Sequence, residues 1–238
     1  MEINELVTAY NAVHHKTWEN DDFLKTNLEI SRSLYTEQSL VNRNPITKEL
    51  HVLALLHGLP FTPAQQVFLI NYSNKVKEIL GNSMAFYVKP ENLGLELCVL
   101  KWPEETYNQG LVKEISSELS KLNVSKEGFE LTINGFQINP DGCFVARGID
   151  RSGSFRKLRS HLKNTVKEFP VRQSQWVHIP LGRILEPIGK SKFQVLNAAV
   201  TESISRIEIN IGFVGALKLI NETQWYMEQH EVLKTFSP

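Results

Sequence analysis

The chain has 238 residues, a length that fits one large domain or two small lobes. Hydrophobic residues make up 42% and charged residues 22%, so a disordered or fibrous chain is excluded. The 26 basic and 26 acidic side chains cancel, which argues against nonspecific nucleic-acid binding, and we expect no DNA partner.

The first 47 residues differ from the rest and predict a helical extension ahead of a main body over 48–238. They contain no glycine and carry seven acidic side chains against four basic ones. Ile3, Leu6, Tyr10 and their apolar neighbours fall on one helical face, and a weaker second helix is expected over 23–35. A break is predicted at 42–45, where asparagines flank an arginine before Pro45.

The main body alternates between strand and helix patterns. Thr62 and Pro63 form a typical helix start, and Gly81 a typical helix end. Apolar runs and turns predict strands over 52–56, 84–88, 93–100, 129–138, 143–149, 176–185 and 207–220, with 225–227 continuing or pairing with the last strand. Helices are expected over 62–80, 103–122, 154–167 and 192–205.

An internal repeat organises these elements. The order strand, turn, helix, strand occurs over 52–100 and again over 143–185. Two similar lobes facing each other across a cleft would produce this repetition. Because alternate side chains of a strand share a face, Gly94 and Glu96 are expected to point one way in the first lobe. His178 and Pro180 are expected to do so in the second.

Two short stretches at the ends of the repeats resemble the motifs of the two-histidine (2H) phosphoesterases. This family includes 2′-5′ RNA ligase-like and RNA 2′,3′-cyclic phosphodiesterase-like proteins. Residues 90–97 read Pro-Glu-Asn-Leu-Gly-Leu-Glu-Leu, similar to the family's Pro-Glu-Asn-Leu-His-Leu-Thr-Leu. Residues 178–183 read His-Ile-Pro-Leu-Gly-Arg, similar to His-x-Thr-Leu-x-Arg. The resemblance covers 50–220. It implies an α+β, two-lobed, pseudo-symmetric fold with mostly antiparallel sheets flanking a central cleft.

The departures from the family's motifs affect its chemistry directly. In the family, one histidine is a general acid, the other a general base, and the hydroxyls bind the phosphate. Here Gly94 replaces the first histidine, while Glu96 and Pro180 replace the hydroxyl residues. A carboxylate near a phosphate repels it, and proline has neither a hydroxyl nor an N–H to donate. The resemblance therefore implies a degenerate member that binds a nucleotide, an RNA end or another phosphorylated ligand without two-histidine catalysis.

Two other functions remain open. An active phosphodiesterase could use Glu96 and His178 as its acid/base pair, if burial raises the pKa of the carboxyl. Alternatively, the cleft is vestigial and the chain is an interaction module, whose protein partner the sequence does not identify. For a ligand in the cleft, the candidate binding residues are Arg183, Gly94, Arg147 and Arg151.

A cationic stretch lies over residues 147–167, with Asp150 as its one acid. Arg156, Arg159, Lys163 and Lys167 recur at spacings that predict one exposed stripe on a helix. A solvated helix face explains such a stripe, and the alternative is a track for phosphates beside the cleft.

No cofactor or metal is expected. The adjacent His14 and His15 diverge on a helix, and no phosphate-binding glycine loop or zinc motif is present. The two cysteines, Cys98 and Cys143, each lie alone in an apolar run and are expected to be buried, reduced thiols. The amino-terminal sequence is acidic rather than signal-like, and no apolar run approaches about 18 residues, so we expect a cytoplasmic protein without a membrane partner.

Overall fold

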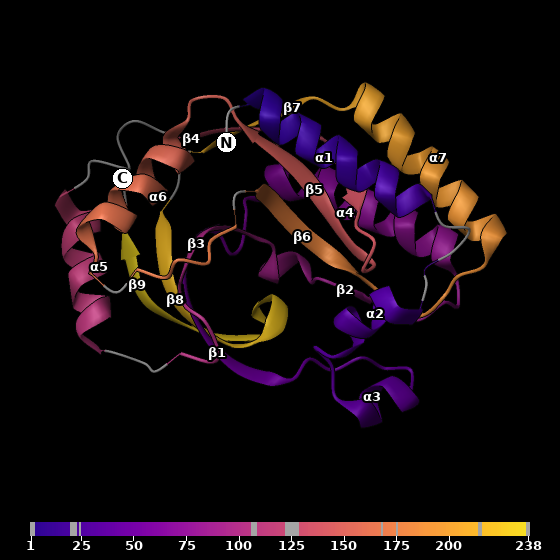
Figure 1. Cartoon of the computed structure of the whole chain (residues 1–238), viewed down its shortest axis with the longest axis horizontal. Coiled ribbons are helices and arrows are strands. Elements are labelled where there is room, and N and C mark those ends of the chain that lie inside the picture. The colour runs from indigo at the N-terminus through magenta and orange to yellow at the C-terminus, as the bar shows by residue number, and fades with distance from the viewer. Residues whose placement is uncertain are drawn as a thin grey trace.

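Two antiparallel sheets form the framework of the described chain (Figure 1). The computed structural model describes residues 3–19, 23, 25–105, 109–121, 129–167, 169–174, 176–213 and 216–236. The first sheet has the order β3-β1-β8-β9, and the second has the order β2-β6-β5-β4-β7. The strands are β1 (Glu49–Gly58), β2 (Ala85–Tyr87), β3 (Gly94–Lys101), β4 (Phe129–Ile138), β5 (Cys143–Asp150), β6 (Val177–Ile184), β7 (Ile209–Phe213), β8 (Leu217–Gln224) and β9 (Gln229–Phe236).

Helices pack against both sheets, and three of them precede β1 in the sequence. They are α1 (Ile3–Trp18), α2 (Lys25–Arg32), α3 (Glu37–Val41), α4 (Pro63–Leu80), α5 (Gln109–Lys121), α6 (Ser154–Thr165), α7 (Lys190–Arg206) and the short 3-10 helices η1 (Pro90–Asn92) and η2 (Trp225–Met227). The start of α4 is fixed as the sequence predicts, because Thr62 and Gln65 cap each other's backbone N–H groups. No helix in the described ranges is long and apolar enough to cross a membrane.

The predicted repeat is present in the topology and gives two matching lobes. In the first lobe, β1 pairs with β3, and α4 lies between them in the sequence. In the second lobe, β5 pairs with β6, and α6 lies between them in the sequence. The order β3-β1-β8-β9 therefore matches β6-β5-β4-β7 strand for strand. α4 contacts β6 of the second lobe, whereas α6 contacts β3 of the first lobe and β4 of its own. The α+β, two-lobed, pseudo-symmetric fold is thus confirmed.

Three of the predicted elements need correction. The apolar run over 207–220 is not one strand, because β7 pairs with β4 in the second sheet and β8 with β1 in the first. The 225–227 stretch forms η2 rather than a strand. The strand β9 that follows it was not predicted, and neither was the short helix α3 near the amino terminus. The helix expected over 103–122 begins at Gln109, while residues 106–108 and 122 lie outside the described part of the chain.

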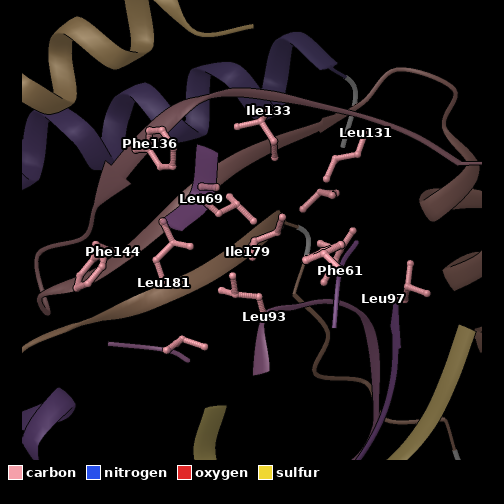
Figure 2. Close-up of a cluster of buried hydrophobic side chains, with 14 of the residues drawn as sticks. Phe61, Leu69, Leu93, Leu97, Leu131, Ile133, Phe136, Phe144, Ile179 and Leu181 are labelled. Carbon is pink, nitrogen blue, oxygen red and sulfur yellow. The ribbon is translucent and has the colours of Figure 1, made fainter. Parts of the chain in front are cut away.

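One hydrophobic core runs through both lobes (Figure 2). Ile179 and Leu181 of β6 meet Leu69 of α4 on one side and Leu93 beside β3 on the other. Successive side chains of β1 point to opposite faces of the first sheet. Leu55 therefore belongs to the large core, while Ala54 and Leu56 belong to a second apolar cluster on the other face. The shared core holds the two lobes against each other and makes β3 and β6 neighbours.

The amino-terminal extension packs on the second sheet. α1 contacts β4 and β5, and α2 contacts β6 (Figure 1). The Tyr10 hydroxyl donates to the Val177 carbonyl at 2.8 Å, and the Thr17 hydroxyl donates to the Ile138 carbonyl at 2.8 Å. These buried hydrogen bonds fix α1 over the face of the sheet that carries His178.

Candidate functional site

We call the face of the first sheet that carries Glu96, and the face of the second sheet that carries His178, the inner faces. On the second sheet, the register pairs Arg147 with His178 and Cys143 with Arg183, so these side chains leave the same face. On the first sheet, Leu56 of β1 pairs with Glu96 of β3 and with Lys218 of β8. The inner face of the first sheet also carries Glu222, Ile220 and their partners on β1.

The segment η2 connects the two inner faces (Figure 1). Met227 packs in the apolar cluster on the inner face of the first sheet. The Tyr226 hydroxyl accepts a hydrogen bond from Arg183 Nε of the second sheet, and its ring packs against Phe86 of β2. The turn after β8 therefore fills part of the space between the lobes with the chain's own side chains.

His178, the one family histidine that the sequence retains, is mostly buried on β6. Among the described residues its Nδ1 has no hydrogen-bond partner. Burial, together with the cationic Arg159 and Arg183, lowers the pKa of His178 to about 4. The ring is consequently uncharged at neutral pH and has one nitrogen that can donate and one that can accept.

Arg147, at the paired position on β5, is 1% exposed. Its Nη2 donates to the Asn11 side-chain oxygen at 3.1 Å, and its guanidinium lies 4.7 Å from the centre of the Tyr10 ring. Nε and Nη1 are buried and have no partner among the described residues. A cation buried without a carboxylate is costly, because the lost hydration is only partly replaced by an amide and an aromatic face.

Arg183 is committed to contacts within the chain. Nη1 donates to the Ser31 hydroxyl at 2.6 Å and to Asp141 Oδ2 at 2.7 Å, while Nε contacts Tyr226. These bonds connect α2, the turn before β5 and η2 at one guanidinium. The predicted ligand-binding residue thus holds three separate segments together.

Gly94 and Glu96 lie where the family's first motif would place a histidine and a hydroxyl residue. A Cβ added at Gly94 would lie 3.1 Å from Leu56 Cδ2, so a larger side chain requires Leu56 to move. Glu96 is mostly buried, and this burial raises the pKa of its carboxyl despite the nearby cation Arg159. Burial therefore favours the neutral, protonated form of the Glu96 carboxyl group.

Glu222 is a buried carboxyl that sequence reasoning missed. It is 4% exposed, and its Oε1 accepts a hydrogen bond from the Met227 N–H at 3.1 Å. Burial, partly offset by that bond and reinforced by Glu96, raises the pKa of Glu222 to about 8. Glu222 stands in the polar stretch Asn-Glu-Thr-Gln after the apolar run that ends at Ile220, so the sequence carries little signal of its burial.

Arg159 was predicted to be exposed on the cationic stripe of α6, and this prediction is wrong. The side chain is mostly buried and donates to the backbone carbonyls of Glu96, Leu97 and Trp176. It thereby joins the edge of β3 to the segment that enters β6. Arg151 lies on the surface at the end of β5 and forms an ion pair with Glu208.

The structure therefore separates the predicted site residues. His178 and Arg147 lie at paired positions, Arg183 is on the same face, and Glu96 and Gly94 lie on the neighbouring β3. Arg151 stands apart at the surface. Within the described ranges, no group of three or more histidine, cysteine or acidic side chains is arranged to hold a metal ion.

Comparison with known proteins supports the fold only. No family model matches the sequence, and no curated protein matches it. Among solved structures, the chain resembles TT0787 of Thermus thermophilus, with a TM-score of 0.51 and 17% sequence identity. The match covers 78% of this chain and 97% of that one. Such a likeness agrees with the two-lobed, pseudo-symmetric α+β fold.

Proposed function

We propose that the chain is a degenerate 2H phosphoesterase-like protein that binds a phosphorylated ligand, such as a nucleotide or an RNA end, on the inner face of its second sheet. The fold and the order of the two altered motifs support the family. The observation that carries the binding function is the pair formed by Arg147 and His178. Their unpartnered nitrogens are buried at paired positions of adjacent strands.

A phosphate group suits these two side chains. Phosphate oxygens accept charge-assisted hydrogen bonds from a guanidinium, often through two of its N–H groups. Arg147 has Nε and Nη1 available among the described residues, and a neutral imidazole adds one further donor. Asn11, which now accepts from Arg147 Nη2, is an uncharged partner that an anion would displace, with α1 moving to admit it.

The same site is poorly equipped for acid/base catalysis. A general base works best with a pKa near the operating pH, and the pKa of His178 is about 4. Gly94 supplies no second imidazole, and Pro180 no hydroxyl. One observation favours an active phosphodiesterase as the second candidate: burial raises the pKa of Glu96 and leaves His178 neutral, the directions that an acid/base pair requires.

We expect 2′,3′-cyclic AMP, 3′-AMP or a 3′-phosphorylated dinucleotide to raise the melting temperature of the protein without being turned over. A ligand at about 100 times its Kd adds about 2.7 kcal/mol of stability. Arg147→Lys keeps the charge but loses the fork, and His178→Ala loses the imidazole, so each should weaken binding about tenfold. Calorimetric titration measures the affinities, and Lys157→Gln, an exposed change on α6, is the control.

Three results would change this assignment. Turnover of a cyclic or 2′-5′-linked substrate that disappears in both Glu96→Gln and His178→Ala would establish the phosphodiesterase instead. Binding that is equally strong in Arg147→Lys and His178→Ala would remove the site from the inner face. The absence of both turnover and binding would leave the interaction module with a vestigial cleft as the remaining explanation.

A further inference from the structure

A cavity of about 380 Å³ lies at the amino-terminal end of α6, next to Val177 of β6. The β5–α6 turn and α6 form one wall, α1 contributes a second, and the segment before β6 closes the third. The volume is within the range of small-molecule sites, about 300–1,000 Å³. Neither Arg147 nor His178 lines it.

Charge is concentrated on one wall of this cavity. Arg151, Arg156, Arg159 and Lys163 line it, against the single carboxylate of Asp150. That carboxylate is already used, because it accepts hydrogen bonds from the backbone N–H groups of Ser154 and Phe155. The wall therefore keeps a net positive charge.

Two of these cations, Lys163 and Arg151, make no ion pair or only an exposed one within the described ranges. Lys163 is exposed and makes no ion pair or hydrogen bond with any residue of the described ranges. Arg151 pairs with Glu208, but both side chains are about half exposed, with 49% and 62% of their surface accessible. An exposed pair of this kind contributes little and can be exchanged for a better partner.

Apolar side chains also line the cavity. Leu6 of α1, Phe155 of α6 and Phe169 line the cavity together with Ile3 and Val177. A simple inorganic anion would leave this apolar surface exposed to water, whereas a flat ring would cover it. The cavity thus combines a cationic wall for an anion with an apolar wall for a ring.

We infer that this cavity binds a nucleoside monophosphate, with its phosphate on the Arg151 and Lys163 side and its base against Phe169 and Leu6. The site is additional to the phosphate position on the inner face and does not depend on it. A hydroxyl from Ser160 or Ser174, both of which line the cavity, is available to the sugar or base.

Calorimetric titration with AMP, adenosine and inorganic phosphate tests the site on the full chain. AMP should bind with a Kd below about 1 mM, and adenosine and phosphate each at least about tenfold more weakly. Lys163→Gln should weaken AMP binding about tenfold, whereas Lys157→Gln, one exposed cation on the same helix outside the cavity, should leave it unchanged. Phe169→Ala should weaken AMP binding but not phosphate binding.

The inference is overturned if AMP does not bind, if adenosine binds as well as AMP, or if Lys157→Gln weakens binding as much as Lys163→Gln. The variants also separate this site from the inner face. AMP binding lost in His178→Ala but kept in Lys163→Gln would overturn the cavity and support the proposed function. The reverse pattern would support the cavity alone.

Discussion

Replacing Arg159 with alanine is expected to lower the free energy of unfolding by about 3–5 kcal/mol, because a buried charged donor then leaves its partners unpaired. The guanidinium donates to the carbonyl oxygens of Leu97, of Glu96 at 3.3 Å, and of Trp176 at 3.2 Å. β3 is the edge strand of the first sheet, and these bonds supply donors that no neighbouring strand provides there. Urea unfolding followed by circular dichroism measures the change.

The matched control lies two residues earlier on the same helix. Lys157→Ala removes an exposed cation of α6 and should change stability by no more than about 0.5 kcal/mol. Arg159→Lys keeps the charge but not the planar fork, so it should recover only part of the loss. If Arg159→Ala and Lys157→Ala unfold at the same urea concentration, Arg159 does not join the two lobes.

The repeat was the part of the fold that the sequence predicted best. Each copy combines a buried strand, a well-marked helix start and a second strand, so local signals are sufficient. The division of 207–220 between two sheets was not accessible in this way. Both halves of that run are apolar, and only the pairing of β7 with β4 and of β8 with β1 shows that the chain crosses between lobes. β9 was missed because its residues are mostly exposed and polar.

The site was predicted less completely, because a motif gives positions but not partners. His178 and Arg147 are residues that the sequence selected, and their pairing depends on the β5–β6 register. Arg183 also follows the motif, yet its donors are used by Ser31, Asp141 and Tyr226, which come from distant segments. No helical periodicity could show that Arg159, one cation in a regular stripe, turns inward.

Residues outside the motifs also determine how much of each inner face is covered. In this chain α1 covers Arg147 through Asn11 and Tyr10, and η2 covers the first sheet through Met227. Part of each inner face is therefore covered by the chain's own side chains. Burial on these faces lowers the pKa of His178 and raises the pKa of Glu96.

The buried carboxyl of Glu222 should make the folded protein less stable as the pH rises from 6.5 to 8. Its pKa is about 8 in the folded chain, against an ordinary value of 4.5. Between these values the folded state holds a proton that the unfolded state has lost, so stability falls with rising pH. His57 and His178, each with a pKa of about 4, act in the opposite direction, and their effect fades as the pH rises above their ordinary pKa of 6.5.

Near pH 6.5 the two histidines still offset part of this decline, because they are half protonated in the unfolded chain. They contribute equally in the parent protein and in a Glu222 variant, so the comparison of the two isolates the effect of Glu222. One proton difference across this window is worth about 2 kcal/mol, since each pH unit corresponds to about 1.4 kcal/mol. Glu222→Gln should remove that decline while its amide oxygen still accepts from the Met227 N–H. Glu96→Gln should also flatten the curve, because Glu96 is one of the groups that raise the pKa of Glu222. Urea unfolding at fixed pH values measures this, with the exposed Glu231→Gln as the control. A decline of the same size in Glu222→Gln would mean that the carboxyl is already ionised at pH 6.5 in the folded chain.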